Sequence, residues 1–397
     1  MLHRRHLLAG AFAMPAIARA AETPGVTADE LKIGNTMPYS GPASAYGVIG
    51  RCEQAFFRMI NDQGGIAGRK INFVTYDDGY SPPKTVEQVR RLVEQDRVAF
   101  LFNTLGTASN TAILRYVNQR RVPHLFLATG ADKWGDHEQH PWTIGYQPSY
   151  RVEAQIYTRH MLAQKPGAKL ALLYQNDDFG KDYLAGMRDV LGPRFDAVAQ
   201  QSFEITDPTV DSQVVALQAS GAEVLLTAAT PKFAAQAIRK VFDVGWRPLN
   251  YLTNVSISIG SVMQPAGAEK GVGIITSAYV KVANDQAWAS DAGMLGWRDF
   301  MRRYMPEADL EDSGYITGYG VSTTLMQVLH QCEGDFSREN VMRQATALHG
   351  FTNPTLLPGI TVNTSPTNYR PIRQMQLQRW TGSNWQRFGE VMQSTEA

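Results

Sequence analysis

From Leu31 onward, short apolar runs alternate with longer stretches whose apolar residues recur at helical spacing. The runs LKIGNTM, INFVTYDD, VAFLFN and VPHLFLA are rich in β-branched and aromatic residues, which favours strands. Helical stretches such as VIGRCEQAFFRMINDQ lie between them, and the glycines of GGIAGRK end that first helix. This repeating order of strand and helix predicts a parallel, doubly wound α/β sheet.

The same order begins again after the connector PWTIGYQPSY. Helices are expected over 151–164, 181–191 and KFAAQAIRKVFDVG, and strands at KLALLYQ, AEVLLTAA and PLNYLT. The tail from Gly271 ends in a hairpin expected to turn at Gly382-Ser383. We therefore predict two doubly wound α/β lobes joined by a hinge, with a ligand cleft between them. The expected boundaries are 31–127 with about 255–335 for lobe one, and 128–254 with about 336–397 for lobe two.

Residues 1–20 have the three parts of an export signal in the right order. Arg4 and Arg5 precede a short apolar segment, and Ala18-Arg19-Ala20 has the small-x-small pattern of a signal-peptidase site. The apolar segment is shorter than the roughly 20 residues that a bilayer span requires. The paired arginines also resemble a twin-arginine signal. The residue directly after the expected cut is Ala21 and not a cysteine, so we predict a periplasmic protein without a lipid anchor.

Composition narrows the function classes. The chain has 38 basic and 37 acidic residues, and this balance argues against a nucleic-acid partner, which would need a strongly basic surface. Its two cysteines, Cys52 and Cys332, leave two interpretations open in an oxidising compartment. They form either one long-range disulfide or two buried free thiols.

The ends of the expected strands carry polar groups but no recognisable catalytic set. In open α/β sheets the ligand lies outside the carboxyl ends of the strands, and here those ends are rich in Ser, Thr, Asn, Gly and aromatics. The triplet at 178–180 matches the Asp-Phe-Gly of kinases, but no other kinase motif accompanies it, and there is no Gly-x-Ser-x-Gly elbow. An α/β hydrolase would need a nucleophile with a base in reach. We therefore expect no enzyme, no cofactor and no metal site.

Thr107 and Ser109 stand where a helix begins, after FLFNTLG. Free backbone N–H groups and hydroxyls at a helix start favour an anion such as a ligand carboxylate. The alternative is that both hydroxyls only cap the helix. A second small turn, Ala128-Thr129-Gly130, follows the next strand and is expected beside the first.

Aromatic and polar residues at other chain breaks complete the candidate site. Tyr46, Phe179 and Tyr315 are aromatics in or near glycine-bearing breaks, where an aromatic side chain is more often a pocket wall than core. Thr230 and Asn254 follow two strands of the second lobe.

At these residues the chain resembles the periplasmic Leu/Ile/Val-binding proteins, the solute receptors of ABC importers with the type I periplasmic-binding fold. The resemblance covers nearly the whole mature chain and rests on YSGPASAYG, MINDQGGIAGRKI, LYQNDDFGKDY and TDPTVDSQVVALQASGAEVLL. It implies two doubly wound lobes joined by three crossings that enclose a solute. It also implies the membrane subunits of an ABC permease as partners.

The resemblance assigns roles to individual residues. Tyr46 takes the place of an aromatic that packs on the ligand, Thr107 holds the ligand carboxylate, and Ala128 and Gly130 complete that carboxylate site. Phe179 takes the place of an aromatic from the second lobe.

The largest departure from the family pattern lies in YLTNVSIS. Amino-acid binders of the family present a carboxylate there to the ligand ammonium, whereas this chain has Asn254 and Val255. An ammonium buried without a counter-charge costs several kcal/mol. A carboxylate ligand without an α-ammonium, aromatic or aliphatic, therefore fits these residues at least as well as a branched-chain amino acid.

The expected function is that of a monomeric solute-binding protein of an ABC importer, which closes by a hinge on a small carboxylate-bearing solute. The alternative is a periplasmic receptor that senses the solute without transport. The expected ligand-binding residues are Tyr46, Thr107, Ser109, Ala128, Thr129, Gly130, Phe179, Thr230, Asn254 and Tyr315.

Overall fold

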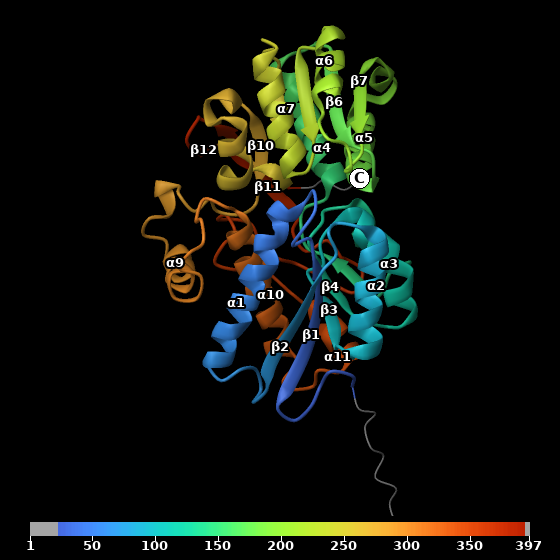
Figure 1. The fold of residues 1–397 in the computed structure, drawn as a ribbon, viewed down its shortest axis with the longest axis vertical. Coiled ribbons are helices and arrows are strands. Elements are labelled where there is room, and N and C mark those ends of the chain that lie inside the picture. Colours follow the sequence, from blue (N-terminus) through green and yellow to red (C-terminus); the bar gives the residue numbers. More distant parts are fainter. Residues whose placement is uncertain (1–22, 394–397) are drawn as a thin grey trace, which may run out of the picture.

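The computed structural model describes residues 23–393, so the expected export signal at 1–20 lies outside the described residues. The chain forms two α/β lobes, one above the other in Figure 1, as the alternating pattern predicts. Within the described residues, no helix combines the length and the apolar character that a membrane span needs.

Lobe one is built on a five-stranded parallel sheet with the order β2-β1-β3-β4-β5, a doubly wound arrangement. Its strands are β1 (Glu30–Met37), β2 (Lys70–Asp77), β3 (Phe100–Phe102), β4 (His124–Leu127) and β5 (Thr143–Gly145). Its helices are α1 (Gly47–Asp62), α2 (Pro82–Arg90), α3 (Thr107–Gln119), α9 (Ala292–Tyr304), α10 (Gly314–Gln331) and α11 (Arg338–Ala345).

Lobe two is built on a seven-stranded sheet with the order β12-β11-β10-β9-β8-β6-β7, in which only β11 runs antiparallel to its neighbours. Its strands are β6 (Leu170–Gln175), β7 (Ala199–Phe203), β8 (Val224–Ala228), β9 (Leu249–Leu252), β10 (Ile275–Ala278), β11 (Gln374–Trp380) and β12 (Trp385–Gln393). Its helices are α4 (Tyr150–Gln164), α5 (Asp178–Leu191), α6 (Asp211–Ala219), α7 (Pro231–Asp243) and the short α8 (Gln264–Ala266). The antiparallel β11–β12 pair is the expected hairpin.

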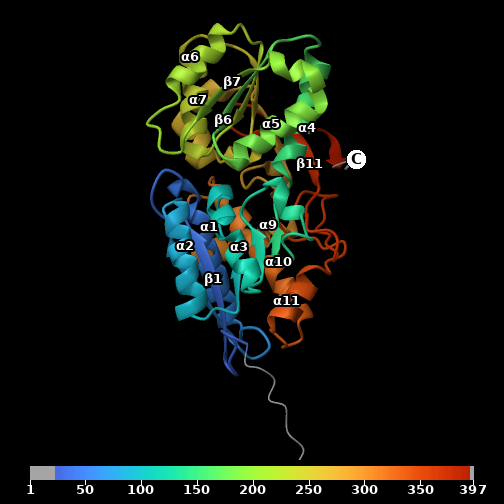
Figure 2. The same cartoon turned by 90° about the vertical axis from the view of Figure 1, so that its right-hand side faces the viewer.

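The chain passes between the lobes three times: after β5, after β10 and before β11. The boundaries differ from those expected. Lobe one runs through β5, past residue 127, because β5 pairs with β4. The segment that rejoins lobe one begins after β10 and runs to about residue 372, since Tyr279 and Ile372 are buried in the lobe-one core. In Figure 2 the two lobes lie one above the other, with α9, α10 and α11 in the lower lobe and β11 in the upper.

Helix α1 shows how lobe one is held together. Its buried side carries Cys52, Phe56 and Phe57, spaced so that they face the sheet and α10. Phe56 meets Tyr319 of α10 edge-on, with ring centroids 5.2 Å apart. Cys52 and Cys332 are both free thiols, which decides between the two interpretations of the cysteines.

Candidate functional site

The cleft between the lobes divides into two neighbouring compartments. The first compartment has an empty volume of about 360 Å³, and the second has about 620 Å³. Both volumes include space that is open to solvent. Tyr46, Ile49, Gln147 and Val255 line both compartments, so the two are halves of one cleft. The Tyr46 hydroxyl donates a hydrogen bond across the cleft to the carbonyl oxygen of Val255, at 3.0 Å.

The first compartment is formed where strands of both lobes end. Its lobe-one wall comes from the residues that follow β1, β2, β3 and β4, and its lobe-two wall from those that follow β6, β8 and β9. This is the place where open α/β sheets bind ligands. The residues that line only this compartment are Tyr80, Leu105, Gly106, Thr107, Ala128, Tyr150, Phe179 and Thr230.

The start of α3 brings groups to the first compartment that suit an anion. Gly106 stands at the N-cap with φ of 100°, and no side chain caps the helix, so the first N–H groups of α3 have no intrahelical partner. A side chain at Gly106 would meet the Tyr80 ring at 2.7 Å, so only glycine lets the chain turn here. The hydroxyl of Thr107 lies beside these N–H groups. This arrangement suits a carboxylate.

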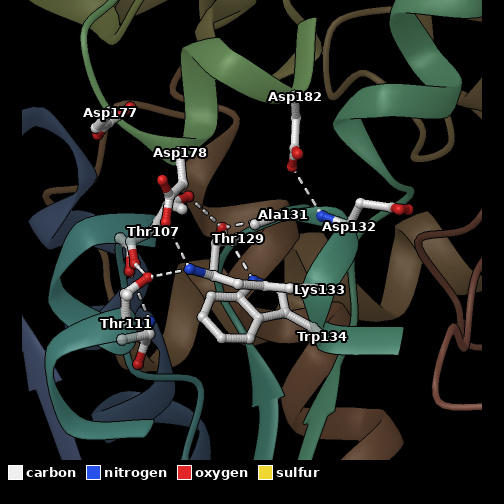
Figure 3. Close-up of polar contacts among 12 residues, drawn as sticks. Thr107, Thr111, Thr129, Ala131, Asp132, Lys133, Trp134, Asp177, Asp178 and Asp182 are labelled. Atoms are coloured by element: carbon white, nitrogen blue, oxygen red, sulfur yellow. Dashed lines mark hydrogen bonds and ion pairs between the residues drawn. The ribbon is translucent and has the colours of Figure 1, made fainter. Parts of the chain in front are cut away.

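Thr129 supports Thr107 from behind. The two hydroxyl oxygens are 2.6 Å apart, and the Thr129 hydroxyl also accepts hydrogen bonds from the Ala131 N–H and the Trp134 indole N–H, both at 3.3 Å (Figure 3). Thr129 is buried and lies outside the walls of both compartments. The structure therefore makes Thr129 a support for Thr107, whereas the sequence placed it in contact with the ligand.

Three other expected site residues also lie outside both compartment walls. Ser109 turns away from the cleft, and its hydroxyl accepts a hydrogen bond from Thr85 at 2.9 Å. Gly130 packs against Tyr150, whose N–H it accepts at 2.8 Å. Tyr315 lies in the lobe-one core, where its carbonyl accepts from the Cys52 thiol. A hydroxyl or a ring next to a chain break does not by itself face the cleft, because the first turn of the helix decides its direction.

The other six expected residues line the cleft: Tyr46, Thr107, Ala128, Phe179, Thr230 and Asn254. Phe179 does so from the first turn of α5, which begins three residues earlier than expected. The helix starts there because the Asp177 side chain accepts a hydrogen bond from the Gly180 N–H. That these six residues contact a solute stays a prediction.

Asn254 is held by a carboxylate that the sequence did not bring near it. Glu153 of α4 accepts the Asn254 backbone N–H at 2.9 Å and its side-chain amide N–H at 2.8 Å. Three hydroxyls, those of Tyr157, Tyr183 and Ser277, also donate to Glu153. Burial raises the pKa of Glu153, and these hydrogen bonds lower it in part.

Five donors saturate the Glu153 carboxylate, which has about four lone-pair positions. Glu153 is fully buried and lines neither compartment. An acid therefore lies one layer behind the cleft wall, and Asn254 stands between it and the solute.

Sequence reasoning did not identify several other residues that line the cleft, although some of them follow the end of a strand. Tyr80 follows β2, while Gln147 and Tyr150 follow β5, so listing the exits of these two strands would have found them. Tyr279 follows β10. Asp312 comes from the loop before α10, and no local pattern places that loop at the cleft.

A group of contacts joins the lobes at one edge of the cleft (Figure 3). Lys133 of lobe one forms an ion pair with Asp178 of α5, with 2.6 Å between nitrogen and oxygen. The Asp132 N–H donates to the Asp182 carboxylate at 2.8 Å. Burial raises the pKa of Asp182 to about 7, and the nearby carboxylates of Asp132 and Asp178 add to this effect. Together with the Tyr46–Val255 hydrogen bond, these contacts show the lobes closed on the cleft.

Within residues 23–393, no group of three or more His, Cys, Asp and Glu side chains is placed to hold a metal ion. The groups that face the cleft are instead hydroxyls, amides, aromatic rings and one carboxylate.

Comparisons with known proteins agree with this architecture. A family profile described as "Periplasmic binding protein" matches residues 30–384. The "Leu/Ile/Val-binding protein homolog 7" of Brucella abortus (strain 2308) is 24% identical over 323 residues, which cover 77% of this chain and 78% of that protein.

Solved structures share the fold. A branched chain amino acid ABC transporter protein from Thermus thermophilus, with bound valine, has a TM-score of 0.83 at 14% identity, covering 92% of this chain and 97% of that one. The fatty acid ABC transporter substrate-binding protein from Thermomonospora curvata has a TM-score of 0.77 at 19% identity, covering 94% and 95%. At such identities the likeness establishes the two-lobed fold alone.

Proposed function

The chain belongs to the periplasmic binding protein family, and from this premise we propose that it delivers a carboxylate solute without an α-ammonium to an ABC permease. As a member of this family it is an extracytoplasmic substrate-binding protein and not an enzyme. The identity of the solute, the membrane partner of the protein and the route by which the protein is exported are the parts that we propose.

The observation that carries the choice of solute is the saturated Glu153 carboxylate. An α-ammonium in the cleft would need a counter-charge, because burying an unpaired charge costs several kcal/mol. Glu153 already accepts five hydrogen bonds and is separated from the cleft by Asn254. Asp177 and Asp178, the other acids at this side, cap α5 and pair with Lys133. No acid of the first compartment is therefore available to an α-ammonium.

The carboxylate end of the solute has a suitable site at the start of α3. Uncapped N–H groups and the Thr107 hydroxyl lie together there, and no acid lines this compartment. Tyr46, Tyr80, Tyr150 and Phe179 give the remaining wall an aromatic character that suits an apolar body. Similar proteins are named for both kinds of solute: one for a fatty acid, which has no amino group, and others for branched-chain amino acids.

Binding by hinge closure is supported by the contacts that cross the cleft. Tyr46 bonds to Val255, Lys133 pairs with Asp178, and each pair joins the two lobes. A solute held between the lobes would add contacts to the closed form only and would shift the protein toward it.

The test compares matched pairs by isothermal titration calorimetry on the mature protein beginning at Ala21. Each pair joins an amino acid to the same acid without its amino group: leucine with 4-methylpentanoate, norleucine with hexanoate, and phenylalanine with 3-phenylpropanoate. Of the three acids without an amino group, we expect the one that binds best to bind at least about tenfold more tightly than the amino acid of the same pair, a difference of about 1.4 kcal/mol. A consistent preference for the amino acids would refute the proposal.

A transport assay tests the partner. A strain that lacks this protein should lose uptake of the radiolabelled acid, and expression of the protein should restore it. Binding without any effect on uptake would favour a sensing receptor.

A further inference from the structure

The second compartment is rich in hydrogen-bond acceptors. Its polar wall includes the Asp312 carboxylate, the Asn254 amide and the hydroxyls of Ser258, Ser261 and Ser313. None of the residues that line it is a lysine, an arginine or a histidine. The compartment therefore offers one carboxylate and several other acceptors to a donor group or a positive charge.

Asp312 keeps one oxygen for the compartment. Its Oδ1 accepts the Gly314 N–H at 3.0 Å and the Ser258 hydroxyl at 3.2 Å. Within residues 23–393, no group donates a hydrogen bond to Oδ2. The charge of Arg51 lowers the pKa of Asp312 in part, but Arg51 makes no hydrogen bond with this carboxylate in the described chain. Burial raises the pKa of Asp312, so a cation that arrives with the solute would relieve an unfavourable environment.

Asn254 adds a second acceptor with a fixed direction. Its side-chain nitrogen donates to Glu153, so the oxygen of the same planar amide is turned the other way. Asn254 lines the second compartment, and the amide oxygen is the polar atom left to face it. The negative charge on Glu153 polarises the amide and makes that oxygen a stronger acceptor.

Aromatic rings also favour a cation in the second compartment. Tyr279 and Tyr46 both line the second compartment, and the face of a tyrosine ring attracts a cation. A carboxylate, an oriented amide oxygen and aromatic faces together match an ammonium group more closely than a hydroxyl or a methyl group.

We propose that the solute is an ω-amino acid, with its carboxylate at the start of α3 in the first compartment and its ammonium beside Asp312 and Asn254 in the second. The inference rests on the proposed function for the carboxylate end. The shared wall of Ile49 and Gln147 connects the two ends of the solute. The charge separation distinguishes this solute from an α-amino acid, whose ammonium lies next to its carboxylate. Dicarboxylates are excluded because their second anion would face Asp312.

The experiment measures binding by calorimetry with three series of four to eight carbons: ω-amino acids, unsubstituted acids and dicarboxylates. We expect the ω-amino acid of the best length to bind at least about tenfold more tightly than the unsubstituted acid, and the dicarboxylate to bind most weakly. Asp312→Asn should remove most of that tenfold preference and leave the binding of the unsubstituted acid within about twofold. The asparagine keeps the Oδ1 acceptor for Gly314 and Ser258, so the variant should fold.

Glu307→Gln is the matched control, because Glu307 lies on the same loop, is exposed and lines neither compartment. It should leave the preference unchanged. If unsubstituted acids bind as tightly as ω-amino acids, the inference fails while the proposed function stands. The same holds if Asp312→Asn weakens both series equally. If no acid of any series binds, both fail. Should Asp312→Asn not fold, Ser261→Ala provides a milder test, expected to weaken only the ω-amino acid.

Discussion

Replacing Glu153 with glutamine tests whether this buried acid orients Asn254. A glutamine amide has one acceptor atom and brings two donors of its own. With its oxygen in the place of Oε1, it still accepts from the Asn254 N–H and from the hydroxyls of Tyr157 and Ser277. Its NH2 group then faces the side-chain nitrogen of Asn254, which donated to the lost oxygen. Asn254 relieves this donor–donor contact only by turning its amide over.

Glu153→Gln should change both the stability of the protein and its preference between solutes, and the structure indicates the size of each effect. One or two buried donors lose their acceptor, and each unsatisfied donor costs about 1–3 kcal/mol, so the free energy of unfolding should fall by about that amount. Tyr183 limits the loss, because its hydroxyl can turn to Thr253. The turned Asn254 amide presents a donor to the second compartment in place of an acceptor. An ω-amino acid should therefore bind at least about tenfold more weakly, whereas an unsubstituted acid should change little.

Urea unfolding followed by circular dichroism measures the first effect, and calorimetry with both solutes measures the second. Tyr157→Phe is the control, because it removes one donor from Glu153 and leaves the carboxylate and Asn254 in place. It should lower stability without changing the preference between solutes. If Glu153→Gln kept the full preference for the ω-amino acid, Asn254 would not be oriented by Glu153 as described.

Four further predictions test other parts of the structure. Thr107→Ala should weaken acid binding by about 1.5–3 kcal/mol, the range for a hydrogen bond to a charged group, while Ser109→Ala should leave it unchanged in calorimetry. Tyr46→Phe removes a hydrogen bond that exists only in the closed form, so affinity should fall up to about tenfold and small-angle scattering should show a larger open fraction. In this closed form Asp182 accepts the Asp132 N–H and burial raises its pKa to about 7. We expect opening to expose Asp182 and lower that pKa, so that protons favour the closed form: affinity should rise up to about tenfold from pH 8 to pH 6, and Asp182→Asn should abolish this dependence. Glu53 is buried on α1 without a hydrogen-bond partner in the described chain, and burial raises its pKa well above 4.5. The free energy of unfolding should therefore fall as pH rises beyond 4.5, because the unfolded chain releases the Glu53 proton first. Glu53→Gln should remove this fall, and an unchanged pH profile in the variant would contradict this reasoning.

Most of the fold could be predicted from the sequence because its strands and helices carry strong local patterns. The hydrophobic period and the turn residues placed α1, α4 and the β11–β12 hairpin within a residue or two. The lobe boundaries could not be found in this way. β5 has three residues, and the return of residues 279–372 to lobe one depends on packing between segments far apart in sequence.

The site was predictable only where it follows strand ends. Tyr46, Thr107 and Ala128 lie in exits that the rule for parallel sheets points to. Ser109 shows the limit of the rule, because a hydroxyl two residues into a helix faces the neighbouring helix and not the cleft. Glu153 carries no local signal at all: it lies on a helix face among buried residues, 101 positions from the asparagine that it holds.

The positions of two acids decide where a solute of this cleft can carry positive charge. A carboxylate at the place of Asn254 would face the solute directly and favour an ammonium next to the bound carboxylate. With Glu153 one layer behind and saturated by its own donors, that place offers a neutral, oriented amide oxygen. Asp312, which lines the second compartment, is the acid that remains in contact with the cleft. Because a buried charge is stable only beside its partner, the ammonium is favoured beside Asp312 and the Asn254 amide oxygen, at the end of the solute away from its carboxylate.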